Sequence, residues 1–324
     1  MALQTIDDVE SAVARLRAGG LVALPTETVY GLAGDASSED AVARIFAAKA
    51  RPAAHPVIVH LPSVSAARSW ASHVPPWAVA LMETFWPGPL TVVVPKAPAV
   101  LDVVTGGQPT VGLRVPAHPM TLQVLEEFSG GLAAPSANRF GTVSPTTAVH
   151  VVAGLGGVLD PERDAVLDGG PCPVGVESTI VGAWDDAPRL LRPGAVTADQ
   201  ISAVTGREVS THTEGVRTPG STATHYAPRA RVVLVEADQV DKAATTANGQ
   251  RVALLALRDV DGPPDLPRLA EPADADEYAQ VLYSALRTAD DSGVDLVLAV
   301  LPAPAGLGMA IRDRLRRCAD GAAR

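Results

Sequence analysis

Residues 19–61 read GGLVALPTETVYGLAGDASSEDAVARIFAAKARPAAHPVIVHL. Leu21 to Leu24 are apolar and follow a Gly-Gly pair, which predicts a short buried strand. Pro25 ends that strand because proline has no N–H for the sheet ladder. One carboxylate and three hydroxyls follow at once, from Glu27, Thr26, Thr28 and Tyr30. A polar group at the end of a buried strand predicts a ligand site in an α/β protein.

The next segment predicts a helix that ends in two different basic residues. Ser38 is a suitable N-cap for a helix that runs to Lys49, and Pro52 prevents its continuation. The chain has 26 basic residues, of which only Lys49, Lys96 and Lys242 are lysines. A compact ammonium near the rigid guanidinium of Arg51 suits a polyphosphate. The same pair is explained equally well as a solvated helix end, where basic side chains interact favourably with the helix dipole.

Several further blocks, in order, carry a resemblance to one family. The chain resembles the YrdC-like threonylcarbamoyl-AMP synthases, which start the threonylcarbamoyl-adenosine modification of tRNA. The matching blocks are PTETVYGL (25–32), KARP (49–52), PVIVH (56–60), FWPGPLT (85–91), GLRVP (112–116), APSAN (134–138), VESTIV (176–181) and LRPG (191–194). The likeness continues through THYAPRA (224–230) and GLGMAIRDRL (306–315). It covers nearly the whole chain and implies the longer, two-domain form.

Composition limits the function classes. The net charge is −10, and residues 1–206 carry 12 basic and 19 acidic side chains. Such a balance disfavours tight, sequence-independent binding of nucleic acid. No apolar run is long enough for a membrane span, and the start has no signal-peptide pattern. The two cysteines, Cys172 and Cys318, have no metal-binding spacing, so a reduced, cytoplasmic location is the simplest interpretation.

The pattern of elements predicts two α/β domains. We expect a YrdC-like catalytic domain over 1–206, with a twisted mixed sheet around a large cavity, beginning with a helix capped by Thr5. Residues 207–229 are rich in Thr, Gly, Pro and Ser, which predicts a linker that closes over the active site as a lid, with Gly215 and Gly220 as hinges. Alternating strands and helices over 230–324 predict a smaller Rossmann-like domain.

The resemblance implies an ATP-dependent reaction in two stages. L-threonine and bicarbonate (or CO2) give an N-carboxylated threonine, whose new carboxylate attacks the α-phosphate of ATP and releases pyrophosphate. Magnesium is expected to accompany ATP, held by phosphates and water, because the sequence has no carboxylate motif for it. The product, threonylcarbamoyl-AMP, is then used by a downstream tRNA threonylcarbamoyl transferase.

By motif position the resemblance assigns two groups of residues. The L-threonine pocket is expected to contain Thr28, His60, Arg114, Ala134 and Ser178. The ATP site is expected to contain Lys49, Arg51, His55, Thr110, Ser136, Asn138, Ser144, Arg192 and Tyr226, with Lys49 and Arg51 as the catalytic pair. Tyr226 lies in the predicted linker, where packing in either core does not readily explain it. Without the resemblance, His60 would be interpreted as a core histidine and Arg192 as a surface arginine.

Two alternatives come from other functional classes. The chain could be an RNA-binding module, which the acidic charge and 4% aromatic content disfavour. It could also be a nucleotide-binding regulatory protein without turnover, which the sequence alone does not separate from an enzyme. A carbamoyl-transfer protein of hydrogenase maturation would need further domains with cysteine-rich zinc motifs, and two isolated cysteines do not supply them.

Overall fold

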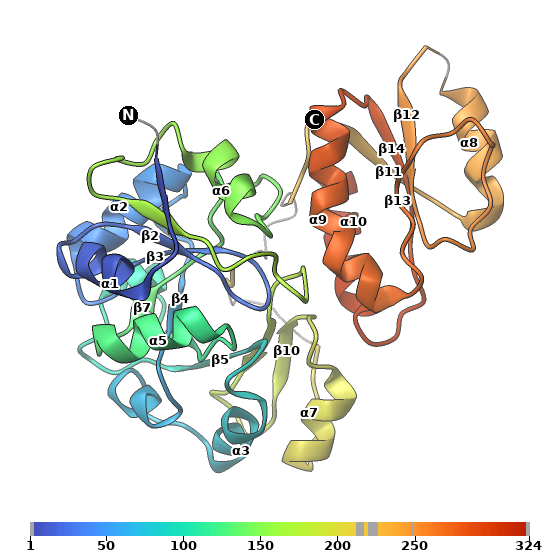
Figure 1. Cartoon of the computed structure of the whole chain (residues 1–324). Coiled ribbons are helices and arrows are strands. Elements are labelled where there is room, and N and C mark those ends of the chain that lie inside the picture. Colours follow the sequence, from blue (N-terminus) through green and yellow to red (C-terminus); the bar gives the residue numbers. More distant parts are fainter. Residues whose placement is uncertain (1–2, 212–216, 220–225, 248, 322–324) are drawn as a thin grey trace. The chain divides into compact units, whose positions relative to one another are not determined.

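The computed structural model describes residues 3–211, 217–219, 226–247 and 249–321. The chain forms two compact units (Figure 1). The first contains Met1–Phe140, Pro145–Pro173 and Glu177–Ser221. The second contains Thr222–Arg324 together with two short segments from the N-terminal half, Gly141–Ser144 and Val174–Val176. The C-terminal unit therefore takes in chain from within the predicted catalytic domain.

A ten-stranded mixed sheet forms the centre of the first unit, in the order β1-β8-β2-β3-β7-β4-β6-β5-β9-β10. Parallel and antiparallel pairs alternate irregularly: β4 pairs parallel with β6, for example, and β6 pairs antiparallel with β5. Most strand positions are fully buried, which accounts for their apolar sequences. The strands are β1 Gln4–Ile6, β2 Val22–Leu24, β3 Gly31–Asp35, β4 Ile58–His60, β5 Leu90–Pro95, β6 Thr110–Arg114, β7 Leu132–Ala133, β8 Ala165–Leu167, β9 Thr179–Gly182 and β10 Arg189–Arg192.

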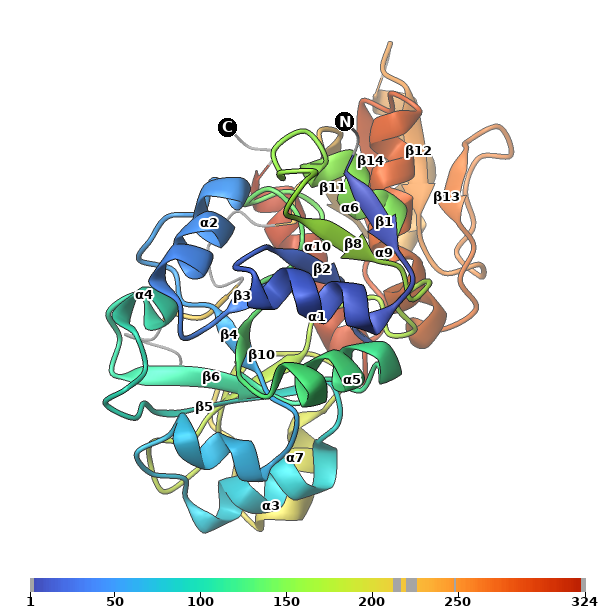
Figure 2. The same ribbon diagram turned by 60° about the vertical axis from the view of Figure 1, so that its left-hand side comes forward.

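Helices cover this sheet, and α1 and α5 pack side by side (Figure 2). The expectation that Thr5 caps the first helix is wrong, because Thr5 lies in β1 and Asp8 is the cap, accepting a 2.7 Å hydrogen bond from the Ser11 N–H. The predicted cap at Ser38 is confirmed by its bond from the Ala41 N–H. The helices are α1 Val9–Arg17, α2 Glu39–Lys49, η1 Ser65–Ser69, α3 Pro76–Phe85, α4 Asp102–Thr105, α5 Pro119–Phe128, α6 Ala148–Leu155 and α7 Ala198–Thr205.

The polar loop after β2 is a hairpin connection. Val22–Leu24 pair antiparallel with Gly31–Asp35, so residues 25–30 join two neighbouring strands. The sequence did not predict β3, since GLAGD contains no β-branched or aromatic residue. Strand β7 follows β3 in the sheet, and Gly31 also bridges to Ser136 just beyond β7. The hairpin thus places the polar loop beside the APSAN segment.

The second unit is a small parallel α/β domain. Its sheet has the order β11-β14-β12-β13, and every pair is parallel. Figure 1 shows α9 and α10 on one face and α8 on the other. This agrees with the Rossmann-like prediction. The elements are β11 Arg231–Val235, η2 Ala237–Gln239, α8 Val240–Thr246, β12 Val252–Leu255, β13 Arg268–Ala270, α9 Ala275–Asp291, β14 Leu296–Val300 and α10 Gly308–Gly321.

Candidate active site

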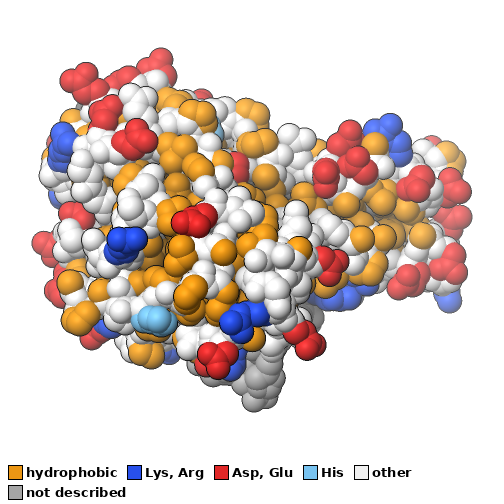
Figure 3. All heavy atoms as spheres, turned by 90° about the horizontal axis from the view of Figure 1, so that it is seen from below, with side chains coloured by type: hydrophobic (Ala, Val, Ile, Leu, Met, Phe, Trp, Pro, Cys, Tyr) orange, Lys and Arg blue, Asp and Glu red, His pale blue; other side chains and the backbone are white. Residues whose placement is uncertain are grey.

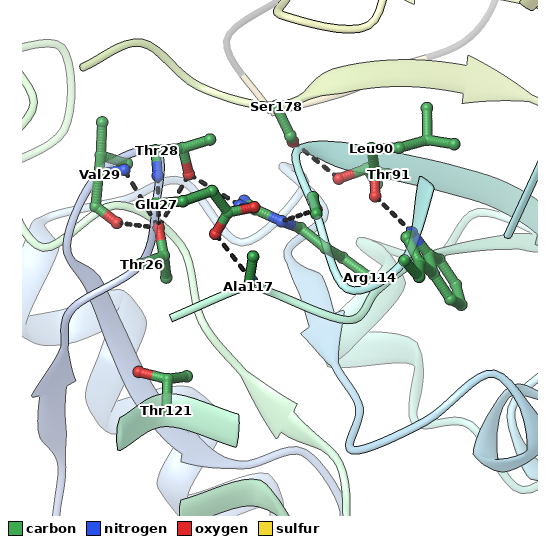
Figure 4. Close-up of polar contacts among 12 residues, drawn as sticks. Thr26, Glu27, Thr28, Val29, Leu90, Thr91, Arg114, Ala117, Thr121 and Ser178 are labelled. Carbon is green, nitrogen blue, oxygen red and sulfur yellow. Dashed lines mark hydrogen bonds and ion pairs between the residues drawn. The ribbon is translucent and has the colours of Figure 1, made fainter. Parts of the chain in front are cut away.

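Arg114, the last residue of β6, is at the centre of a buried polar cluster (Figure 4). Its side chain is almost fully buried, and three contacts fix the guanidinium. Nε donates to the Gly88 carbonyl at 3.2 Å, and Nη2 donates to Thr28 Oγ1 at 2.9 Å. Nη2 also lies 2.7 Å from Glu27 Oε1 in an ion pair. A guanidinium held this firmly can orient a carboxylate.

Hydrogen bonds within the hairpin loop hold its hydroxyls in position for the contact between Thr28 and Arg114. Thr26 Oγ1 accepts from the N–H groups of Thr28 and Val29 and donates to the Val29 carbonyl. It also lies 2.8 Å from Thr28 Oγ1. This local turn holds Thr28 in place, so the hydroxyl facing Arg114 is preorganised.

Ser178 is a second buried hydroxyl, just before β9. Its Oγ lies 2.8 Å from Thr91 Oγ1 and accepts a 3.1 Å hydrogen bond from Arg192 Nη2. Arg192 Nε donates to the Ser178 carbonyl, and Nη1 donates to the Pro219 carbonyl. The structure therefore places Arg192, which we expected in the ATP site, against a residue expected in the threonine pocket. The antiparallel pairing of β9 with β10 brings the two together.

His60 ends β4 and lies opposite Arg114 in the parallel register of β4 with β6. The side chain is buried, and among the described residues its Nε2 has no hydrogen-bond partner. Burial, and then the charge of Arg114, hold the pKa of His60 well below its usual value. A neutral imidazole beside a guanidinium offers a ring nitrogen for a ligand hydroxyl or amine.

Lys49 lies at the C-terminal end of α2, and its ammonium is buried against the APSAN segment. Nζ donates to the carbonyl oxygens of Ser136 and Asn138. Burial, with the nearby charge of Arg51, lowers the pKa of Lys49 well below its usual range. An ammonium has three protons, so one remains for a phosphate oxygen. The structure thus brings together three residues expected in the ATP site.

Arg51 lies just beyond the same helix end. Its Nη2 donates to the Pro56 carbonyl at 2.7 Å, and its guanidinium lies 5.5 Å from the centre of the Phe140 ring. The His55 ring packs against Phe140 with centroids 5.2 Å apart. Partial burial, and then the charges of Arg51 and Arg217, lower the pKa of His55. His55 therefore tends to stay neutral while Arg51 supplies the positive charge.

Ala134 and Thr110, which the resemblance assigns to the two binding sites, lie just beyond a strand and at the start of one. The Ala134 N–H donates to the Ile58 carbonyl at 3.0 Å, which joins the chain beyond β7 to β4. Thr110 begins β6 and pairs with Pro95. The role of Thr110 in the ATP site stays a prediction.

Tyr226 and Ser144 belong to the second unit. The expectation that packing does not explain Tyr226 is wrong: the residue is 1% exposed. Its ring stacks on Tyr283 at 5.8 Å, the Arg314 guanidinium lies 5.5 Å from its centre, and the Cys318 thiol donates to its carbonyl. The proposed hinges Gly215 and Gly220 lie outside the described residues.

Other chemistry finds little support in the described part of the chain. Cys172 and Cys318 are buried free thiols. Burial raises the pKa of Cys172 to about 12, so it is an unreactive thiol. Within the described residues no group of three His, Cys, Asp or Glu could hold a metal ion. No helix among them is both long and apolar enough to cross a membrane. The face drawn in Figure 3 intersperses acidic and basic side chains.

Sequence reasoning gave no role to Glu27 or Thr91, although both are buried in the cluster. Glu27 Oε2 accepts from the Ala117 N–H at 3.0 Å while Oε1 pairs with Arg114. Thr91 contacts Ser178. Glu27 lies in the polar loop and Thr91 in the FWPGPLT block, so both belong to stretches that the sequence had already marked as candidate sites. Their partners are far along the chain, and only the fold identifies them.

These features define an α/β protein of two units, with a buried polar cluster around Arg114 and a separate pair of basic residues, Lys49 and Arg51, in the first. The chain belongs to the Sua5/YciO/YrdC family: the family model described as "Telomere recombination" matches residues 14–194, and that described as "Threonylcarbamoyl-AMP synthase, C-terminal domain" matches 196–320. The family resemblance and the fold class predicted from sequence are confirmed.

Relatives match along almost their whole length. A threonylcarbamoyl-AMP synthase of Pyrococcus abyssi is 39% identical, covering 95% of this chain and 93% of the relative. A Bacillus subtilis protein of the same name is 38% identical, covering 97% and 93%. The crystal structure of P. abyssi Sua5 complexed with L-threonine superposes with a TM-score of 0.89 at 36% identity, covering 99% and 98% of the two chains.

Proposed function

We propose that this chain is an L-threonylcarbamoyladenylate synthase. The amine of L-threonine combines with bicarbonate (or CO2) to give a carbamate, with loss of water when bicarbonate is the donor. A carbamate oxygen then attacks the α-phosphorus of ATP, the bond to the β-phosphate oxygen breaks, and pyrophosphate leaves. The reaction needs orientation and charge neutralisation more than a nucleophilic side chain, and the buried cationic groups of the first unit can supply both.

The observation that carries the proposal is the buried cluster around Arg114, in a chain 36% identical to a Sua5 structure determined with L-threonine. We assign the substrate carboxylate to Arg114. Thr28, His60 and Ser178, with the backbone at Ala134, surround its remaining polar groups. Buried partners for a substrate hydroxyl allow strong rejection of analogues that lack it. On this assignment L-valine is excluded because it leaves these groups unpaired.

The ATP side rests on Lys49 and Arg51, which we assign to the phosphates as the catalytic pair. Ser136 and Asn138 adjoin Lys49, and His55 adjoins Arg51. Thr110, Ser144, Arg192 and Tyr226 complete the assignment by motif position. Magnesium would come with ATP, held by phosphates and water, where it neutralises charge on the leaving pyrophosphate.

We infer the remaining properties from the same assignment. Residues 1–206 form the catalytic domain, 207–229 the linker and 230–324 the C-terminal domain. The product passes to a downstream tRNA threonylcarbamoyl transferase in the cytoplasm. The acidic net charge of −10 supports a small-molecule enzyme that does not itself bind tRNA tightly.

The test is pyrophosphate release from ATP and magnesium with bicarbonate, comparing L-threonine, L-serine, L-valine and no amino acid. We expect release that requires both bicarbonate and L-threonine. Release without an amino acid would identify a plain ATPase instead. No release, with binding of ATP or RNA intact, would favour a binding protein without turnover.

A further inference from the structure

Arg114 has few donors left for a ligand. Its Nε–H donates to the Gly88 carbonyl, and Nη2 donates to Thr28 Oγ1 and lies 2.7 Å from Glu27 Oε1 in an ion pair. Of the three guanidinium nitrogens of Arg114, Nη1 alone makes none of these contacts with the described residues. A carboxylate that reaches Arg114 therefore meets Nη1, and the side-on fork of Nε with Nη2 is already occupied.

Glu27 holds the Arg114 guanidinium in this orientation. Glu27 is 8% exposed as a residue, and its carboxylate contacts Arg114 through one oxygen and the Ala117 N–H through the other. Figure 4 shows Glu27 lying between Arg114 and Ala117. Ala117 follows β6 by three residues, so this contact also ties the hairpin loop to the chain leaving that strand. Removal of either charge would leave the other buried and uncompensated, which is strongly unfavourable.

The opposite charges of Glu27 and Arg114 affect which ligands this site can bind. Arg114 is 4% exposed, and a lone guanidinium so deeply buried would attract any small anion. Under the proposed function, L-threonine, bicarbonate and ATP all carry anionic oxygens and compete for such a site. With Glu27 at 2.7 Å the site has no net charge, so a simple anion gains less from entering it.

We propose that Glu27 is a positioning and specificity-determining residue of the threonine pocket. It holds Arg114 with Nη1 free for the substrate carboxylate, and it cancels the guanidinium charge so that the pocket accepts a zwitterionic α-amino acid in preference to a simple anion. This inference rests on the proposed function, because it takes the Arg114 cluster to be the threonine pocket. Glu27 acts here through Arg114 and through the field it creates.

The test compares two ligands by calorimetry on the full chain. L-threonine is the zwitterion, and 3-hydroxybutyrate is the same skeleton without the amine. For Glu27→Gln we expect L-threonine to bind about tenfold more weakly while 3-hydroxybutyrate binds equally well or better, so that their affinity ratio falls about tenfold or more. Inorganic phosphate should also begin to compete with L-threonine.

A matched control separates this effect from general destabilisation. Asp164 is 1% exposed and pairs with Arg44 at 2.7 Å, so Asp164→Asn also removes the charge of a buried carboxylate from an ion pair, but in another part of the first unit. Its affinity ratio should equal that of the wild type. If Glu27→Gln does not fold, Glu27→Asp keeps the charge on a shorter side chain: affinities fall there, but the ratio stays close to the wild-type value.

Three results would overturn the proposal. One is an equal loss of both ligands in Glu27→Gln, because that would reduce Glu27 to a structural role. The second is a collapse of the ratio in Glu27→Asp, and the third is the same ratio change in Asp164→Asn. Failure of the wild-type chain to bind L-threonine would instead count against the proposed function.

Discussion

His60 and Arg114 lie directly opposite each other where the parallel strands β4 and β6 end. Both side chains are buried, and one must be neutral because two adjacent buried cations would repel each other. The imidazole is the neutral member of the pair, which agrees with the lowered pKa of His60. One strand register thus places a cationic and a neutral group side by side in one buried cluster.

This relationship predicts how stability depends on pH. The unfolded chain protonates His60 below its usual pKa of 6.5, whereas the folded chain does not until a much lower pH. Stability contributed by the neutral form is therefore present above pH 6.5 and is lost as pH falls below it, by up to about 1.4 kcal/mol per pH unit. Chemical unfolding between pH 7 and 5 should show a shallower slope in His60→Gln. An identical slope would contradict this account of His60.

Replacement of Arg114 by lysine should remove most threonine use. A lysine ammonium cannot contact Gly88, Thr28 and Glu27 and still present a planar donor edge. We expect kcat/KM for L-threonine to fall about a hundredfold or more in Arg114→Lys. Arg44→Lys is the matched control, because Arg44 also pairs with a buried carboxylate, that of Asp164. Equal losses in the two variants would indicate a general effect on the fold.

ATP use should decline at alkaline pH because of Lys49. Its pKa lies well below the usual 10.5, so the ammonium loses its proton earlier than an exposed lysine as pH rises. In steady-state kinetics, kcat/KM for ATP should fall through that folded pKa in the wild type. The fall should be absent in Lys49→Arg, since a guanidinium stays charged over this range. The same alkaline limb in both proteins would assign it to another group.

Tyr226 should affect stability as well as ATP use. Its ring is buried between Tyr283 and Arg314, so Tyr226→Ala should destabilise the C-terminal unit by about 3 kcal/mol or more. Tyr226→Phe keeps the ring and should retain most of that stability. Thermal unfolding alongside kcat/KM for ATP separates packing from catalysis. A Tyr226→Ala protein with wild-type stability would show that these ring contacts contribute little.

Of the two strands that flank the polar loop, the sequence predicted β2 and missed β3. The apolar run Leu21–Leu24 predicted a strand, and the structure has β2 at Val22–Leu24. Strand β3 was missed because Gly and Ala have low strand propensity, and the polar loop was therefore expected to lead directly into a helix. Only the sheet reveals it as a hairpin.

The sequence identified residues of the candidate site but did not identify which residues they contact. Thr28 with Arg114, and Lys49 with Ser136 and Asn138, were named from motifs and lie together in the structure. Arg192 was expected beside phosphate yet contacts Ser178, because strand pairing decides its neighbours. Tyr226 seemed a linker residue because Tyr283 and Arg314 lie far along the chain, where no local pattern connects them.

The most direct measurement is mass spectrometry of the adenylate formed from ATP, L-threonine and ¹³C-labelled bicarbonate. The account predicts a product with the mass of L-threonylcarbamoyl-AMP that carries the label. It also predicts no such product when L-valine replaces L-threonine. Formation of AMP and pyrophosphate without a labelled adenylate, or an adenylate that carries no label, would contradict the account.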